Sequence, residues 1–470
     1  MIQKSKKFIT ACFVVLLMAT NTNAIILADD TPPEIESELY ILIDARTGHI
    51  IHGQGIHQQG YPASMTKVMT ALLLLEHGSP MDEIIYHSQS AIDSVVPWHS
   101  TIFYHVTENV TVEQALYAIM LRSANDVSNA IAEHVAGSME AFADMMTARA
   151  RELGALNTNF VNAHGLWEPE HVTTPYDMAL IMQEAIKHEK FLEVISTQRY
   201  FFEGDGLEEE DEGEYNLIYN TNSMLFPTSQ FFNPDIVGGK TGFTNQSRQT
   251  LVSYGQRRDM GLITVVMLAD QRPIRYNDTR ALMDYGFEQF RQQRLFSAAD
   301  FELALDLVQR TDEGLLVVGS IDIVPRGNVD LALPIEFDAS GVTTRVDVPD
   351  RLAVPAARDF VVGQVVLEHN GNVLAEMELV TAQAAEALSI EELVALFPEV
   401  NFEGSGTAND SQNSSILNII VNMALVALGI LVAAFIIIRF LQFSRRQRRR
   451  TRRRRQNYSV APRDKKYRYK

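Results

Sequence analysis

An uninterrupted apolar run near the C-terminal end limits how this 470-residue chain can be arranged. Residues 416–438 contain no charged side chain. A helix of that length covers roughly 30 Å, which is the thickness of a bilayer's hydrocarbon core. A buried helix of a globular core is the alternative, but 18 or more uncharged apolar residues in a row favour a span. The sequence therefore predicts a single transmembrane helix at 416–438.

The residues after this run are strongly basic, although the chain as a whole is acidic. Residues 439–470 hold fifteen Lys and Arg against one acid, Asp464, while the formal net charge of the chain is −19. The positive-inside rule places this basic tail in the cytoplasm and the rest of the chain outside. An arginine block can also indicate nucleic acid, but beside a span it favours contact with anionic membrane lipids. The acidic total argues against a nucleic-acid partner.

The N-terminal end has the pattern of a secretory signal. Three lysines in the first seven residues precede an apolar segment that ends at Ala19, and small residues near Ala24 or Ala28 offer a cleavage site. We expect a signal peptide at 1–24, with an uncleaved anchor as the alternative. Cys12, the single cysteine, lies inside this segment. The cleaved chain would have no cysteine, which excludes a disulfide framework, Cys-ligated metals and a thiol nucleophile.

Between these ends the pattern changes once. Residues 34–290 alternate helical and strand-like periodicity and predict a mixed α+β domain. The expected strands lie at 38–44, 49–52, 248–254 and 261–268, and the expected helices at 66–77, 112–122, 126–136, 139–153, 175–188 and 278–291. Within this region the acidic stretch 203–214 matches no Ca²⁺-loop spacing and is read as a solvated hairpin tip.

Residues 292–390 form short β-rich runs, and the dipeptide Asn370-Gly371 between two of them is a strong hairpin signal. We expect a small all-β domain that acts as a spacer above the membrane. Residues 391–415 end in a Gly/Ser/Asn-rich stretch and read as a linker to the span.

The first motif with chemical content is Ser64-Met65-Thr66-Lys67, at the start of an apolar helix. The three-residue spacing places Ser64 and Lys67 on one helix face. A serine alcohol needs a neighbouring base, and a lysine serves as one if desolvation or another cation lowers its pKa. The helix N-terminus adds backbone N–H groups suited to an oxyanion. Alone this motif is weak, since about one match arises by chance in a chain of this size.

Two further motifs follow in order. Ser123-Ala124-Asn125 offers a hydroxyl and an amide, although a helix-capping pair is the ordinary interpretation of such a tripeptide. Lys240-Thr241-Gly242 offers a cation and a hydroxyl for a carboxylate, and Gly242 allows close approach of a substrate; an ordinary strand with a bulge is the alternative.

Together the three motifs are the set described for β-lactamases and penicillin-binding proteins. The chain resembles the D-alanyl-D-alanine carboxypeptidases, the low-molecular-mass penicillin-binding proteins, over roughly residues 34–290 and more loosely over 292–390. The resemblance rests on four segments: Pro62–Lys67 (PASMTK), Asn162–Leu166 (NAHGL), Thr174–Leu180 (TPYDMAL) and Lys240–Thr244 (KTGFT).

The resemblance implies a β-lactamase/transpeptidase-like catalytic domain and a set of residue roles. Ser64 would attack the penultimate D-Ala of peptidoglycan stem peptides, with Lys67 as base. Ser123 would pass a proton to the leaving amine, while Asn125 would hold the substrate amide and orient Lys67. The terminal carboxylate would bind Lys240 and Thr241, with Gly242 beside it. Ser64 and Phe243 would supply the oxyanion-hole N–H groups, and no cofactor or metal would be required.

Some residues depart from the family pattern or carry less weight. Ser247-Arg248 stands where the family usually has Ala-Gly, and Arg275 resembles a family arginine near the carboxylate site. His164 is interpreted as a hydrogen-bonded structural residue, because the base role is already filled. Glu168 is interpreted as a surface residue.

These observations predict a membrane-tethered serine D-Ala-D-Ala carboxypeptidase with an extracellular catalytic domain. Its expected partners are stem peptides ending in D-Ala-D-Ala, β-lactam antibiotics and membrane lipids, but not nucleic acid. A β-lactamase-like hydrolase is one alternative, distinguished by fast release of the penicillin adduct. A catalytically silent penicillin-sensing or wall-binding ectodomain is the other.

Overall fold

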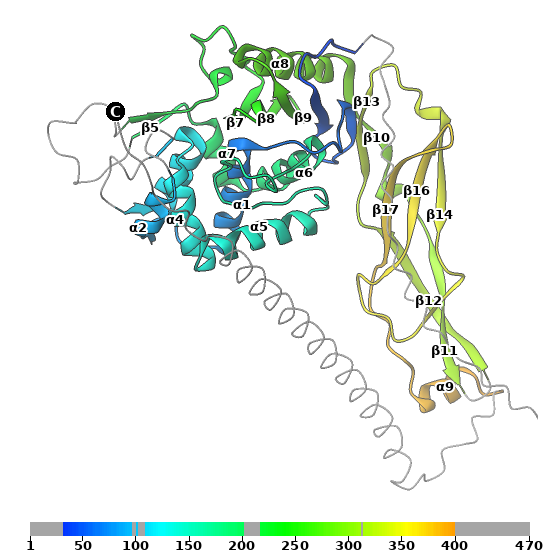
Figure 1. Ribbon diagram of the computed structural model, residues 1–470. Coiled ribbons are helices and arrows are strands. Elements are labelled where there is room, and N and C mark those ends of the chain that lie inside the picture. The colour runs from blue at the N-terminus through cyan, green and yellow to red at the C-terminus, as the bar shows by residue number, and fades with distance from the viewer. Residues whose placement is uncertain (1–31, 96–99, 102–108, 202–216, 312–313, 400–470) are drawn as a thin grey trace, which may run out of the picture. The chain divides into compact units, whose positions relative to one another are not determined.

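The structure is a computed structural model that describes residues 32–95, 100–101, 109–201, 217–311 and 314–399 (Figure 1). The predicted signal peptide, the acidic stretch 203–214, the end of the linker, the transmembrane helix at 416–438 and the basic tail lie outside these residues. Within the described part of the chain, no helix combines the length and apolarity needed to cross a bilayer.

A five-stranded antiparallel sheet with the order β2-β1-β9-β8-β7 forms the centre of the catalytic region. Its strands are β1 (Leu39–Asp44), β2 (Ile50–Gln54), β7 (Ile236–Thr244), β8 (Arg248–Arg257) and β9 (Met260–Ala269). Strand residues point alternately to the two faces. Leu39, Ile41 and Ile43 therefore enter one hydrophobic core, while Tyr40 and Leu42 enter a second core on the opposite face.

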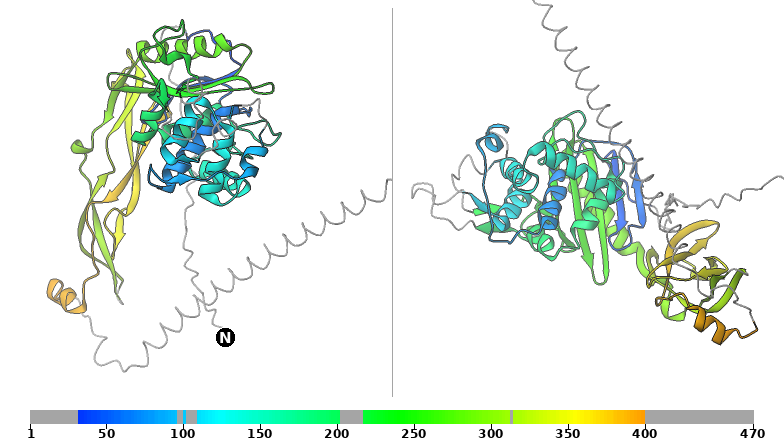
Figure 2. Two further views of the ribbon diagram at one scale, coloured as in Figure 1. Left: turned by 90° about the vertical axis from the view of Figure 1, so that its left-hand side faces the viewer. Right: turned by 90° about the horizontal axis from the view of Figure 1, so that it is seen from below.

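Helices cover both faces, as Figures 1 and 2 show. Most of the helices pack against the first core: α1 (Lys67–His77), α2 (Gln89–Asp93), α3 (Val112–Tyr117), α4 (Asn125–Ala136), α5 (Met139–Glu152), α6 (Pro175–Ala185) and α7 (Glu189–Ser196). The second core is covered by α8 (Arg272–Gln289). Two small strand pairs complete this region: β3 (Ile84–Ile85) with β4 (Val110–Thr111), and β5 (Arg199–Phe201) with β6 (Leu217–Tyr219).

Several helices differ from the sequence prediction: α2 and α7 were not predicted, and the helix expected at 175–188 ends at Ala185. The helix expected at 278–291 begins earlier, at Arg272, because Pro273 suits the first turn of a helix, where its missing N–H is not needed. The helix expected at 112–122 is α-helical only to Tyr117, and residues Ala118–Arg122 form a single π-helical turn. Such turns are rare and often occur at functional sites.

The β-rich region contains two sheets. One pairs β10 (Phe290–Phe296) with β13 (Val329–Pro334), and the other has the order β14-β16-β17-β12-β11-β15. Its strands are β11 (Ala304–Thr311), β12 (Gly314–Pro325), β14 (Val342–Asp347), β15 (Arg351–Ala353), β16 (Val361–His369) and β17 (Asn372–Thr381). The hairpin predicted at Asn370-Gly371 joins β16 to β17, with both turn residues at positive φ, as a type I′ turn requires.

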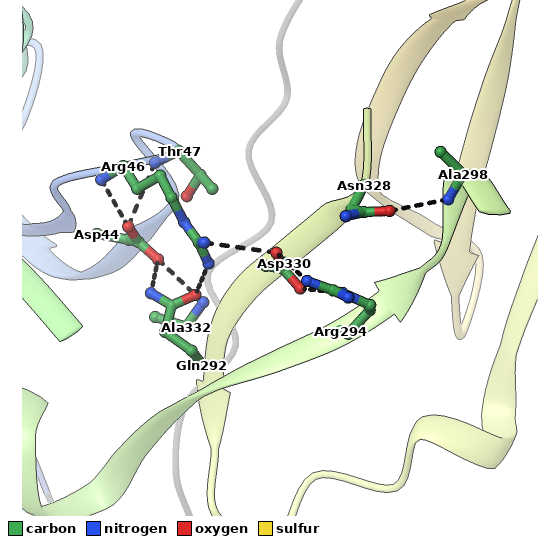
Figure 3. Close-up of polar contacts among 9 residues, drawn as sticks. All are labelled: Asp44, Arg46, Thr47, Gln292, Arg294, Ala298, Asn328, Asp330 and Ala332. Carbon is green, nitrogen blue, oxygen red and sulfur yellow. Dashed lines mark hydrogen bonds and ion pairs between the residues drawn. The ribbon is translucent and has the colours of Figure 1, made fainter. Parts of the chain in front are cut away.

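A buried carboxylate joins β1 to the β10–β13 pair (Figure 3). Asp44, at the end of β1, accepts hydrogen bonds from the backbone N–H groups of Arg46 (2.7 Å) and Thr47 (3.2 Å). Its other oxygen accepts from the Gln292 side chain (2.6 Å) and from the backbone N–H of Ala332 (3.1 Å). Asp44 is fully buried. Two of its four hydrogen-bond donors, Gln292 and Ala332, come from the β-rich region.

The described residues fall into two compact units. The second unit comprises Gln309–Val318 and residues 387–399. It includes the end of β11 and the beginning of β12, and all other elements above lie in the first unit. The second unit contains α9 (Ile390–Leu396), whose first turn is closed by a capping box between Ser389 and Glu392.

Candidate active site

Ser64 lies in a 3₁₀ turn (Ala63–Thr66) that leads directly into α1. The turn packs against the edge strand β7 and its neighbour β8. Ala63, immediately before Ser64, has a left-handed φ of 47°, which is uncommon for a residue with a side chain. Met65 and Thr66 are buried, whereas Ser64 is only partly buried. The fold thus leaves the Ser64 hydroxyl accessible and buries the residues next to it in the chain.

The amine of Lys67 is fully buried and lies beside this hydroxyl. Lys67 Nζ is 3.3 Å from Ser64 Oγ, 2.7 Å from Asn125 Oδ1 and 2.7 Å from the backbone oxygen of His164. Burial, and then the positive charge of Lys240, hold the pKa of Lys67 well below its usual value, while Asp126 opposes this. A neutral amine has two N–H donors and one lone pair. The two short contacts use both donors and leave the lone pair for Ser64.

The π-helical turn positions the second motif. It ends at Ser123, a buried residue with a left-handed φ of 65°. The chain then turns into α4, whose first residue is Asn125. The backbone N–H of Asn125 donates to the carbonyl of Ser100 at 2.8 Å, and its side chain accepts from Lys67. The widened turn therefore brings Asn125 to the buried amine.

The third motif lies on β7, the edge strand beside the Ser64 turn. A Cβ on Gly242 would lie 3.0 Å from the backbone nitrogen of Ser64 and 2.4 Å from Thr250 Oγ1. Only glycine fits between β8 and the Ser64 turn. Phe243 is 58% exposed, so the strand presents both a close backbone approach and an accessible aromatic ring.

Lys240 is a second buried cation. Its Nζ donates to the backbone oxygen of Thr241 at 3.2 Å, and burial together with the nearby charge of Arg275 lowers its pKa to about 7. Thr241 Oγ1 lies 2.9 Å from Thr221 Oγ1. Burial therefore favours the uncharged form of both amines, and Lys240, with a pKa of about 7, retains part of its charge near neutral pH.

Arg275, on α8, forms hydrogen bonds to β7 and to its neighbour β8. Its guanidinium donates to the backbone oxygen of Gly242 at 3.1 Å, to Gln249 Oε1 at 2.7 Å and to Tyr276 OH at 3.0 Å. Tyr276 OH in turn donates to the backbone oxygen of Thr221 at 3.2 Å. Thr221, Gln249 and Tyr276 carry no motif signal in the sequence, because their contacts come from distant segments.

The segment Asn162–Leu166 packs against the Ser64 turn. A Cβ on Gly165, which has a φ of 87°, would lie 1.9 Å from the backbone oxygen of Ala63. His164 presents its carbonyl to Lys67, and its Nδ1 accepts from the Leu166 N–H at 3.1 Å. The sequence analysis did not predict that the backbone carbonyl of His164 accepts a hydrogen bond from Lys67, because every residue type has such a carbonyl. Glu168 is exposed, as expected.

The structure brings Ser64, Lys67 and Asn125 into direct contact, and it places Gly242 against the Ser64 backbone. The departure at Ser247-Arg248 is accommodated locally. Arg248 adopts a φ of 52°, a conformation that glycine adopts more readily, and it forms ion pairs with Glu38 and Asp270.

Comparisons with known proteins identify the family of this chain. The D-alanyl-D-alanine carboxypeptidase family (peptidase S11) matches residues 27–271. The carboxypeptidase DacF of Bacillus subtilis (strain 168) is 29% identical over 345 residues, which cover 73% of this chain and 84% of DacF. DacC of Escherichia coli (strain K12) is 27% identical over 373 residues, covering 75% and 85%.

The fold is also shared with a solved structure. Penicillin binding protein 5 from Haemophilus influenzae superposes with a TM-score of 0.63 at 25% identity, covering 76% of this chain and all of that one. The mixed α/β architecture is therefore that of the penicillin-binding transpeptidase-like fold. The chain belongs to the D-alanyl-D-alanine carboxypeptidase family and is a serine peptidase of that family.

Proposed function

We propose that this protein removes the terminal D-Ala from peptidoglycan stem peptides through an acyl-enzyme on Ser64. The contact that carries the proposal is the one between Lys67 Nζ and Ser64 Oγ. The two hydrogens of the neutral amine are donated to Asn125 Oδ1 and to the backbone oxygen of His164. A buried amine with a lowered pKa is the base that a serine nucleophile requires.

In the acylation step Ser64 Oγ attacks the carbonyl carbon of the penultimate D-Ala while Lys67 Nζ takes the hydroxyl proton. The oxyanion forms beside the backbone N–H groups of Ser64 and Phe243. Lys67 then returns this proton through the hydroxyl of Ser123 to the leaving amine, which departs as free D-Ala and leaves Lys67 neutral. Water then attacks the ester with Lys67 again as base, and the hydroxyl of Ser64 is restored.

The carboxylate of the leaving D-Ala would bind Lys240 and Thr241. Two observations support this assignment. Both residues lie on the strand whose Gly242 contacts the Ser64 turn, and no carboxylate among the described residues hydrogen-bonds the Lys240 amine. A β-lactam presents a carbonyl and a carboxylate in the same relation, so it would acylate Ser64 and block the site.

We further propose that the catalytic region lies outside the cell, tethered by the apolar run 416–438 with the basic tail in the cytoplasm. Charge and hydropathy of the sequence support this topology. The β-rich region 292–390 would act as the spacer, and membrane lipids would be contacted by the span and the tail.

Release of D-Ala tests the proposed reaction. The purified protein is incubated with a peptide ending in D-Ala-D-Ala and, in parallel, with its L-Ala-L-Ala counterpart. We expect the terminal alanine to be released from the first peptide only, and from neither peptide by the Ser64→Ala variant. Release by Ser64→Ala, or a long-lived penicillin adduct without any peptide turnover, would contradict the carboxypeptidase assignment.

A further inference from the structure

We propose that His171 and Thr66 act as positioning residues that orient and polarise the oxyanion-hole amide of Ser64. The inference rests on the proposed function in one respect, since it takes the Ser64 N–H as an oxyanion donor. It concerns two buried side chains that the mechanism above does not use. Neither touches the substrate, and both act through the backbone of the Ser64 turn.

The direction of the hydrogen bonds follows from the histidine. His171 is 2% exposed, and its Nδ1 accepts from the backbone N–H of Val161 at 3.0 Å. The proton of the neutral ring must therefore be on Nε2, which lies 2.8 Å from Thr66 Oγ1. Burial, and then the charge of Lys67, lower the pKa of His171 to about 3, so the ring stays neutral at working pH.

Thr66 passes this bond on to the nucleophile turn. Its hydroxyl accepts from His171 and donates to the backbone oxygen of Ala63 at 2.8 Å. The result is a directed chain of three hydrogen bonds that begins at a backbone N–H and ends on a backbone carbonyl. Chains of this kind strengthen each member by polarisation, by about 10–30% per bond.

The carbonyl at the end of the chain belongs to the peptide bond whose N–H is that of Ser64. A trans peptide is planar, with its C=O and N–H pointing in opposite directions. The carbonyl of Ala63 points to the Thr66 hydroxyl, close to Gly165. The Ser64 nitrogen lies on the side of Gly242 on β7. The same bond therefore fixes the plane of the peptide and draws electron density away from the N–H.

This account also explains why Ala63 is held in its left-handed conformation. That backbone state is unfavourable for a residue with a side chain. The Thr66 hydroxyl holds the carbonyl from one side, and the absence of a Cβ on Gly165 makes room for it on the other. Loss of the Thr66 hydroxyl should let the peptide rotate away from the oxyanion.

The test compares Thr66→Val with Thr70→Val. Thr70 is buried one turn further along, in α1, and also donates to a carbonyl, that of Ala163 at 2.6 Å, which is not part of the Ser64 peptide. Both variants lose one buried hydroxyl-to-carbonyl bond. We expect kcat for D-Ala release to fall about 10-fold in Thr66→Val at nearly constant KM, less than the 10²–10³ caused by deleting an oxyanion donor outright. Thr70→Val should keep kcat within about 2-fold, and Thr66→Ser should restore it.

A spectroscopic readout separates this role from a structural one. In the acyl-enzyme formed with a β-lactam labelled with ¹³C at its carbonyl, the ester stretching band should move to higher wavenumber in Thr66→Val and stay unchanged in Thr70→Val. If Thr66→Val is not recovered folded, His171→Leu is measured in its place. Equal kcat and equal bands in the Thr66 and Thr70 variants would overturn the inference. A wild-type protein that is not acylated at Ser64 would overturn the proposed function and the inference together.

Discussion

The amine of Lys67 lies 3.3 Å from the hydroxyl of Ser64, with no carboxylate among its three hydrogen-bond partners. An ion pair would have kept this lysine protonated. Asn125 and the His164 carbonyl instead accept two hydrogen bonds without adding a counter-charge. The buried site therefore favours the neutral amine, which is the form able to take a proton from serine.

Replacing Lys67 by arginine should abolish acylation. A guanidinium keeps a positive charge but is not deprotonated in proteins, so it offers no base. We expect the rate of covalent labelling by a fluorescent penicillin to fall by about 10³-fold, within the range of general-base effects. Circular dichroism should report a folded protein. Labelling at the wild-type rate would show that Lys67 acts only through its charge.

The pH profile should report both buried amines. For a substrate with a free carboxylate, kcat/KM should rise with pH as Lys67 loses its proton. It should fall again as Lys240, with a pKa of about 7 in place of 10.5, loses the charge that binds the carboxylate. A lowered pKa means that the charge disappears at a lower pH than usual, so this alkaline limb should begin near neutrality.

Two controls isolate the alkaline limb. Lys240→Arg should remove it, because the guanidinium remains charged throughout. A substrate whose C-terminus is a carboxamide should also lack it. Identical profiles for the acid and amide substrates would show that Lys240 does not bind the carboxylate.

Gly165→Ala should disrupt the nucleophile turn. Its new Cβ would clash with the Ala63 oxygen, and its φ of 87° is unfavourable for alanine. We expect a loss of about 3 kcal/mol or more in the free energy of unfolding, together with slower acylation. Gly78→Ala is the matched control, since Gly78 has a φ of 79° with open space around it and should cost only about 1–2 kcal/mol. Equal losses from chemical denaturation would contradict the clash.

Asp44→Ala should weaken the junction between the catalytic and β-rich regions. It leaves buried donors from Gln292 and Ala332 without their acceptor, and we expect a loss of about 3 kcal/mol. Asp330→Ala removes two ion pairs to exposed arginines, one to Arg46 across the junction and one to Arg294 within the β10–β13 pair, and should cost at most about 1 kcal/mol. Turnover of a small peptide per folded molecule should be unchanged in both. A larger loss for Asp330→Ala would show that the surface pairs hold the junction.

Deleting residues 292–390 should lower stability more than Asp44→Ala does, again without lowering the turnover of a small peptide. The cut removes both β-region donors to Asp44 and exposes apolar surface that Ala332 covers. We expect a lower Tm with activity on a small peptide retained at temperatures where the protein is folded. A large loss of turnover in the folded truncation would contradict a purely supporting role.

The sequence predicted the secondary structure best where periodicity is strong. The helix after Ser64 and the hairpin at Asn370-Gly371 agree with expectation, since apolar spacing and turn chemistry are local signals. The π-helical turn before Ser123 was not predicted. It alters one turn of an otherwise regular apolar pattern, which the pattern cannot reveal.

The candidate site divides in a similar way. Side chains with intrinsic chemistry, such as Ser64 and Lys240, could be named from motifs. Contacts made by backbone groups or by ordinary residues could not, and the His164 carbonyl and the Thr66 hydroxyl are examples. Their roles depend on which distant segments pack against the Ser64 turn, and the fold alone supplies that information.

Mass spectrometry of the penicillin-treated protein tests the central claim most directly. After an exposure that just saturates the wild type, followed by proteolysis, the adduct should be located on the peptide that contains Ser64, at one equivalent per chain, and it should be nearly absent from the Lys67→Arg variant. An adduct on any other residue, or full acylation of Ser64 in Lys67→Arg, would contradict the account of a serine activated by a buried neutral lysine.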